Sequence, residues 1–194
     1  MDSSEICRKM EAFLASHPNA ALPIVAAKLG LTREEIEQAV RESDLKSYDE
    51  FRQRCRLTQA FNQLGSEKII PPGPWEKRSS PRRIIPGITV KYRIRGFWPF
   101  GGSFSGPCPL VDLSGGGLAL LADSAPRPGK RVSLLLKSPE REQALCVEGN
   151  IVYTVATGVA GYRHRVGIQF LPFAEKRGCN SPRVLEILTQ FERK

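Results

Sequence analysis

The chain has 194 residues, of which 41% are apolar, 25% charged and 8% aromatic, as in an ordinary globular protein. This composition excludes a chain that is disordered throughout, a coiled-coil rod and a collagen-like fibre. The apolar runs are far shorter than the roughly 20 residues that cross a bilayer, and the first residues are polar where a secretory signal needs apolar ones. We therefore expect a cytoplasmic protein with no membrane partner.

The net charge of +9 is distributed unevenly along the chain. Residues 1–65 contain 9 Lys and Arg against 10 Asp and Glu, a balance of −1, whereas residues 66–194 contain 20 against 10, a balance of +10. An anionic partner is therefore expected at the second part first. The five cysteines are widely spaced and form no C-x-x-C, so we expect neither disulfides nor a cysteine-based metal site, but small buried apolar residues.

Residues 1–65 have helical periodicity and predict an all-α domain of four helices. The first follows Ser3 and Ser4 as capping residues, and the second covers residues 22–29 and ends at Gly30. The third and fourth begin with Thr32 and Ser47, each followed three residues later by a glutamate, which is the pattern of a capping box. The fourth helix is expected to end at Gly65.

Residues 66–87 are rich in proline and basic residues and predict a linker. Beyond it the apolar period changes from helical to alternating, which indicates short strands separated by turns. The expected strands cover residues 89–95, 110–113, 117–122, 132–137, 145–154 and 164–170. About six such strands suggest a small closed or nearly closed barrel. An amphipathic helix over residues 181–191 is expected to cover one opening of this barrel domain, residues 88–194.

Two features near the first strand carry ligand chemistry. Arg78 and Arg82 place two guanidinium groups four residues apart, and Asp112, Ser114 and Gly117 lie where one strand turns into the next. Guanidinium groups match phosphate oxygens, and a carboxylate accepts hydrogen bonds from the N1–H and N2–H edge of guanine. Glycines at the turn, including positions 115 and 116, let a flat ligand approach the backbone. Together these residues suit a guanine-containing phosphate diester.

Residues from about 76 to 192 resemble the PilZ domain, a bacterial receptor module for cyclic di-GMP, through the motifs R-x-x-x-R and [D/N]-x-S-x-x-G. The late segment 165–170 is also similar to the V-G-I/V-x-F strand of that family. The resemblance implies a six-stranded antiparallel barrel with a carboxy-terminal helix. It implies that Arg78 and Arg82 wrap the ligand phosphates, that Asp112 and Ser114 read base and backbone from the barrel surface, and that Gly115, Gly116 and Gly117 form the turn beside them.

Two further basic residues join this set of expected ligand contacts. Lys77 precedes the first arginine, at a position where the resemblance implies that ligand stoichiometry is tuned. Arg83 competes with Arg82 for the second position, and the spacing from Arg78 favours Arg82. No cofactor other than the ligand is expected.

Residues 22–64 resemble one helix-turn-helix half of an AraC-type DNA-binding region. The third helix would then be the recognition helix, with Arg33, Gln38 and Arg41 as candidate DNA contacts. That family carries two such units, whereas here the linker begins where the second should start. Because phosphate contacts dominate affinity for DNA, a domain with a balance of −1 is poorly equipped unless it dimerises. A helical module that binds a protein partner or a second copy of the chain is the alternative.

The sequence offers little for catalysis. Only two histidines occur, and H-E-x-x-H, G-x-S-x-G and G-K-[S/T] motifs are all missing, so we expect neither an enzyme nor a metal site. The hypothesis is a two-domain α+β effector of cyclic di-GMP. Ligand binding would order the arginine-containing linker and thereby alter the output of residues 1–65, either in transcription regulation or in a protein-interaction or dimerisation adaptor without DNA binding.

Overall fold

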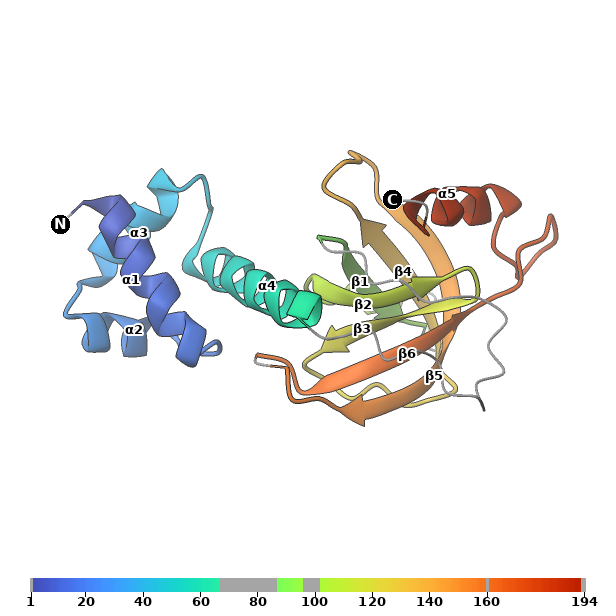
Figure 1. The fold of residues 1–194 in the computed structure, drawn as a ribbon, viewed down its shortest axis with the longest axis horizontal. Coiled ribbons are helices and arrows are strands. Elements are labelled where there is room, and N and C mark those ends of the chain that lie inside the picture. Colours follow the sequence, from blue (N-terminus) through green and yellow to red (C-terminus); the bar gives the residue numbers. More distant parts are fainter. Residues whose placement is uncertain (1, 67–86, 96–101, 160, 193–194) are drawn as a thin grey trace. The chain divides into compact units, whose positions relative to one another are not determined.

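Helices and strands separate along the chain in the computed structural model, which describes residues 2–66, 87–95, 102–159 and 161–192 (Figure 1). The chain divides into two compact units. One contains residues 1–62 and 159–161, and the other contains residues 63–158 and 162–194. The amino-terminal unit is helical and the carboxy-terminal unit is a β-barrel with one helix, which confirms the predicted fold class.

The described part of the first unit contains four helices: α1 (Ser3–Ser16), α2 (Leu22–Leu29), α3 (Arg33–Glu42) and α4 (Tyr48–Ser66). Their apolar faces meet in one core, in which Met10, Leu14, Val25, Ile36 and Phe51 are fully buried. No helix in the described ranges combines the length and the apolarity that a membrane span needs.

The ends of α2 and α3 follow the predicted capping chemistry. Gly30 ends α2 in the left-handed region at φ 64°, which a residue with a Cβ adopts only with strain. At the start of α3, the Glu35 amide donates to Thr32 Oγ1 at 3.2 Å and the Thr32 amide donates to Glu35 Oε2 at 2.8 Å. These bonds from Thr32 hold the pKa of Glu35 below its usual value.

Several local expectations differ from the structure. Asp2, rather than Ser3 or Ser4, is the N-cap of α1, because the helix already begins at Ser3. Helix α4 continues one residue beyond Gly65. Of the cysteines, Cys55 and Cys108 are buried as expected, whereas Cys146 is exposed because it lies on the outward face of its strand. Burial raises the pKa of the Cys55 thiol to about 11, so this thiol is a packing residue.

The strands of the second unit form a closed antiparallel barrel in the order β1-β2-β3-β6-β5-β4. Their bounds are β1 Thr89–Ile94, β2 Cys108–Ser114, β3 Gly117–Ala122, β4 Arg131–Lys137, β5 Leu145–Ala156 and β6 His164–Phe170. Strands β2 and β5 extend beyond the predicted ranges 110–113 and 145–154. Alternate residues of the strands fill the interior, as a small barrel requires.

Helix α5 (Pro182–Glu192) closes one end of this barrel, as predicted (Figure 1). Its residues Leu188 and Phe191 belong to the barrel core. The segment that leads to α5 is fixed by Asn180, which is buried. The Asn180 side chain accepts from the Glu148 amide at 2.8 Å and donates to the carbonyl oxygens of Glu148 and Leu171 at 2.9 and 3.0 Å.

The capping box yields a prediction about the helical unit. Thr32→Ala removes the side-chain acceptor of the Glu35 amide and should lower the free energy of unfolding of this unit by about 1 kcal/mol. The control Thr58→Ala removes an exposed threonine inside α4, whose hydroxyl donates to the Arg54 carbonyl, and should cost nothing because alanine favours helix. Urea denaturation followed by far-UV circular dichroism measures both. Equal midpoints for Thr32→Ala and the wild type would contradict the assigned cap.

Candidate functional site

A β-bulge in β2 decides which residues of this strand face outward. Leu110 pairs with Leu120 and Asp112 pairs with Ala119, so Val111 is an extra residue without a partner of its own on β3. Both Leu110 and Leu113 point into the barrel core. Strict alternation from Leu110 would put Asp112 inside. The bulge reverses the phase and places Asp112 and Ser114 on the outer face of the barrel.

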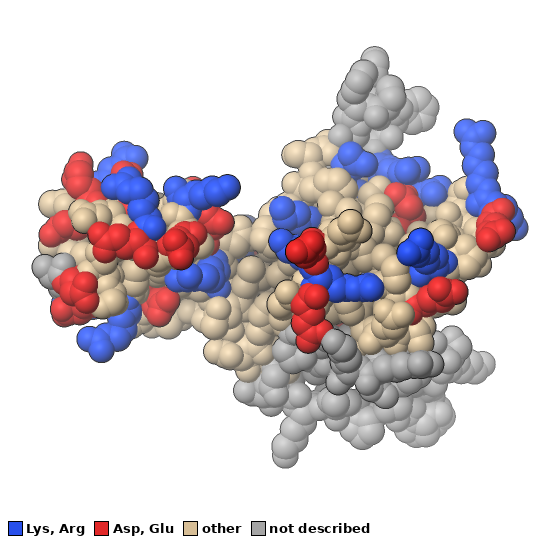
Figure 2. Space-filling model, turned by 90° about the horizontal axis from the view of Figure 1, so that it is seen from above, with Lys and Arg blue, Asp and Glu red and all other residues tan. Residues whose placement is uncertain are grey.

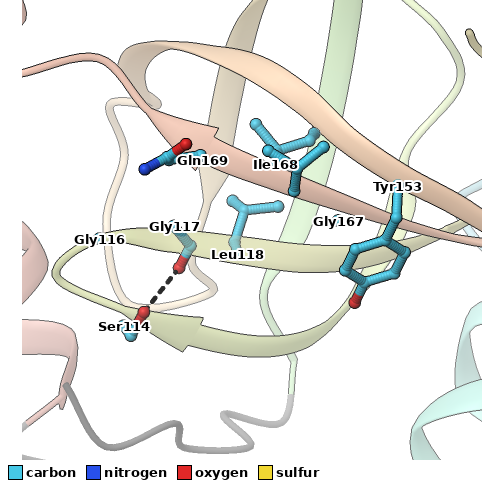
Figure 3. Close-up of a pocket in the computed structure, with 9 residues that line it drawn as sticks. Ser114, Gly116, Gly117, Leu118, Tyr153, Gly167, Ile168 and Gln169 are labelled. Atoms are coloured by element: carbon cyan, nitrogen blue, oxygen red, sulfur yellow. Dashed lines mark hydrogen bonds between the residues drawn. The ribbon is translucent and has the colours of Figure 1, made fainter. Parts of the chain in front are cut away.

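The tight turn between β2 and β3 lies next to these two residues. Ser114 pairs with Gly117, which leaves Gly115 and Gly116 as a two-residue loop. The Ser114 hydroxyl donates to the Gly117 carbonyl oxygen at 3.2 Å (Figure 3). A Cβ on Gly117 would collide with the carbonyl oxygen of Ile168 on β6, whereas a Cβ on Gly116 would meet nothing within 4 Å. The turn is therefore packed against β6 on one side and open on the other.

Beside this turn the outer surface of the barrel has a depression of about 260 Å³. Ser114, Gly116 and Gln169 lie at one end of it, and Tyr153 lies at the other end (Figure 3). A Cβ on Gly167 would collide with the Tyr153 ring, so the ring covers this glycine. The lining thus combines polar groups with glycines and aliphatic residues, which suits a flat ligand with hydrogen-bonding edges.

A second bulge directs Tyr153 toward this depression. On β5, Ile151 pairs with Ile168 and Tyr153 pairs with Gly167, so Val152 is the extra residue. Ile151 is buried in the core, and the bulge brings Tyr153 to the outer face two residues later. The sequence analysis did not single out Tyr153 or Gln169, because their proximity to Ser114 arises from strand order.

Asp112 forms an ion pair that the sequence analysis also missed. Arg165 Nη2 on β6 donates to Asp112 Oδ2 at 2.6 Å, and the two side chains are 35% and 8% exposed. A charge-assisted hydrogen bond of this length in a partly dehydrated place is strong. No signal in the sequence links residues 112 and 165, since their contact depends on both being next to β3.

The structure therefore brings together one half of the predicted ligand residues. Asp112, Ser114 and the three glycines that follow lie around one hairpin. The basic half, which consists of Lys77, Arg78, Arg82 and Arg83, lies outside the described residues.

The candidate DNA contacts lie on the exposed face of α3, next to acidic residues. Arg33 Nε donates to Glu37 Oε1 at 2.6 Å, and Gln38 Nε2 donates to Glu42 Oε1 at 2.9 Å. Arg41 is exposed in the last turn of the helix. Figure 2 shows acidic and basic side chains interspersed on the displayed face of the helical unit. No continuous basic surface forms on α3.

A small closed barrel with a polar depression beside a glycine hairpin defines a ligand-binding β-barrel module. A family model described as the PilZ domain matches residues 76–178, and the chain belongs to this family. The match begins before β1 and ends before α5, so it spans the whole barrel. A comparison with curated proteins finds no match.

Solved structures with a similar fold include those of YcgR, MotI/DgrA and MrkH. YcgR from Escherichia coli, in complex with c-di-GMP, is 17% identical with a TM-score of 0.45, over 61% of this chain and 45% of that one. The Bacillus subtilis inhibitor of motility MotI/DgrA is 16% identical with a TM-score of 0.43, over 63% and 55%. The K. pneumonia MrkH–c-di-GMP complex is 16% identical with a TM-score of 0.42, over 61% and 56%. The matches cover about half the length of these proteins.

The hairpin yields a prediction that separates two adjacent glycines. Gly117→Ala forces a methyl group against the β6 backbone and should lower the free energy of unfolding of the barrel by about 2 kcal/mol. Gly116→Ala is the matched control, because its methyl group enters open space, and it should change stability by less than about 0.5 kcal/mol. Thermal unfolding of both variants measures the difference. Equal stabilities would mean that Gly117 does not lie against β6.

Proposed function

We propose that this chain is an effector that binds cyclic di-GMP on the outer face of its barrel, and that binding alters the output of its helical unit. The observation that carries this proposal is the bulged strand β2, which turns Asp112 and Ser114 to the outer face of the barrel, where Ser114 lines the depression. Membership of the PilZ domain family supports the same ligand.

The outward residues of the hairpin match the edge of a guanine. The Asp112 carboxylate is the acceptor that the N1–H and N2–H groups of guanine need, and the Ser114 hydroxyl lies one pleat away on the same face. Gly116 borders the depression without a side chain, so a planar ring has access to the backbone of the turn. Because Asp112 is buried, water competes weakly for its hydrogen bonds.

The phosphates of the ligand need cationic partners, which we assign to Arg78 and Arg82 from the R-x-x-x-R motif, with Lys77 and Arg83 as neighbours. A guanidinium fork binds two phosphate oxygens at once, and two forks serve the two phosphates of a cyclic dinucleotide. In this proposal the ligand joins the arginine segment to the Asp112 hairpin. The site binds its ligand without turnover, since its residues supply hydrogen bonds and charge but no nucleophile paired with a base.

The output of the helical unit has two candidates, transcription regulation and protein interaction. Two of the three candidate DNA contacts donate to acidic residues of their own helix, Arg33 to Glu37 and Gln38 to Glu42. A phosphate backbone that approached α3 would meet these carboxylates together with the arginine. These contacts and the balance of −1 over residues 1–65 favour a protein partner or a second copy of the chain over DNA.

The ligand assignment is tested by isothermal titration of cyclic di-GMP. Arg78→Ala and Arg82→Ala should each weaken binding tenfold or more, because a hydrogen bond to a charged group is worth about 1.5–3 kcal/mol. Arg127→Ala is the matched control, an exposed arginine in the connection between β3 and β4, and its affinity should equal that of the wild type. Unchanged affinity in both motif variants would refute the role of the two arginines, and no heat with the wild type would refute the ligand.

Experiments on the full chain, with and without cyclic di-GMP, distinguish protein interaction from transcription regulation. We expect size-exclusion chromatography with light scattering to show a ligand-dependent change in association. We expect mobility-shift assays on genomic DNA fragments to show no specific band. A specific shifted band that Arg33→Ala and Arg41→Ala abolish would instead establish transcription regulation through α3.

A further inference from the structure

The Asp112–Arg165 pair lies on the same face as the proposed ligand site and belongs to neither ligand motif. Arg165 lies on β6 opposite Leu121 of β3, and Asp112 lies on β2 opposite Ala119 of β3. The Arg165 side chain therefore reaches diagonally across β3 to the carboxylate. Ala119 is the small residue of β3 opposite Asp112, and the Tyr153 ring covers the next outward position across the sheet, Gly167.

Stability alone explains this pair poorly. Asp112 is buried whereas the Arg165 side chain is 35% exposed, and the desolvation cost of a buried carboxylate offsets much of its attraction to the guanidinium. Arg165 Nε is also buried, and it has no hydrogen-bond partner within the described ranges, which adds a further cost. The position of the pair on the same face as Ser114 points instead to a role in ligand binding.

Recognition of a guanine edge requires a particular orientation of the Asp112 carboxylate. A carboxylate that receives two parallel hydrogen bonds from guanine must lie with its plane along the edge of the base. An aspartate side chain rotates about two bonds and has no fixed plane unless a neighbour holds it. The guanidinium of Arg165 donates to Asp112 Oδ2 at 2.6 Å and so restricts the rotation of the carboxylate.

We propose that Arg165 is a positioning residue for base recognition, which orients the Asp112 carboxylate toward the N1–H and N2–H edge of guanine. This inference rests on the proposed binding of cyclic di-GMP. Arg165 acts through Asp112 rather than on the ligand, so its loss reduces discrimination between bases in addition to affinity.

The test compares two ligands that differ only at this edge, cyclic di-GMP and cyclic di-IMP, whose hypoxanthine bases lack the N2 amino group. The wild type should prefer cyclic di-GMP, and Arg165→Met should weaken its binding about tenfold and reduce the preference several-fold. Arg165→Lys retains the charge without the planar fork and should restore part of the preference. Arg163→Met, an exposed arginine two residues earlier, is the matched control and should behave as the wild type.

A double-mutant cycle with Asp112→Asn separates positioning from direct contact. If Arg165 acts through Asp112, then Arg165→Met should cause no further loss in the Asp112→Asn background. The double variant leaves no unpaired buried charge, so it remains informative where Arg165→Met alone is unstable. Thermal unfolding of every variant accompanies the titrations.

Other results of these titrations would overturn the positioning role, and one of them would also refute the proposed function. An unchanged preference in Arg165→Met, or losses that add in the double variant, overturns the positioning role while the proposed function stands. Equal binding of both ligands by the wild type also overturns it, since the N2 amino group is then not read. No binding of either ligand by the wild type refutes the proposed function itself, and the inference with it.

Discussion

One extra residue in β2, Val111, sets the chemistry of the outer surface of the barrel. Every residue of β2 is buried, and the strand supplies Cys108, Leu110 and Leu113 to the core. Without the bulge, these apolar residues could not all face inward while Asp112 faces outward, since alternation has a period of two. An aspartate inside an apolar core would carry a large desolvation cost. The bulge therefore fills the core with apolar side chains and turns the buried Asp112 carboxylate to the outer side of the same strand.

The second bulge, at Val152 on β5, completes the arrangement. In the order β2-β3-β6-β5, the two bulged strands flank the pair β3 and β6. Asp112 and Ser114 enter from one side and Tyr153 from the other. Between them Ala119 of β3 lies opposite Gly167 of β6, and the Tyr153 ring covers this glycine. The depression is thus bordered by two departures from regular pairing, one on each side of the pair β3 and β6.

The sequence predicted the elements well and the contacts between them only in part. Residues 117–122 and 164–170 have the bounds that alternation indicates, and the capping box at Thr32 marks the start of α3. These features depend on neighbours in the chain. The ion pair of Asp112 with Arg165 and the position of Tyr153 depend on the register of β3 with β6 and of β6 with β5, over separations of tens of residues, for which the sequence carries no local signal.

The distribution of charge restricts how a ligand can act on the helical unit. Cyclic di-GMP carries two phosphate charges, whereas residues 66–194 have a balance of +10. Binding therefore leaves this part of the chain strongly basic, and the change in its field is screened within about 8 Å at physiological salt. In the proposed function the ligand contacts Arg78 and Arg82, which belong to the stretch of sequence between α4 and β1. A contact there would link base recognition at Asp112 to the helical unit through the chain itself.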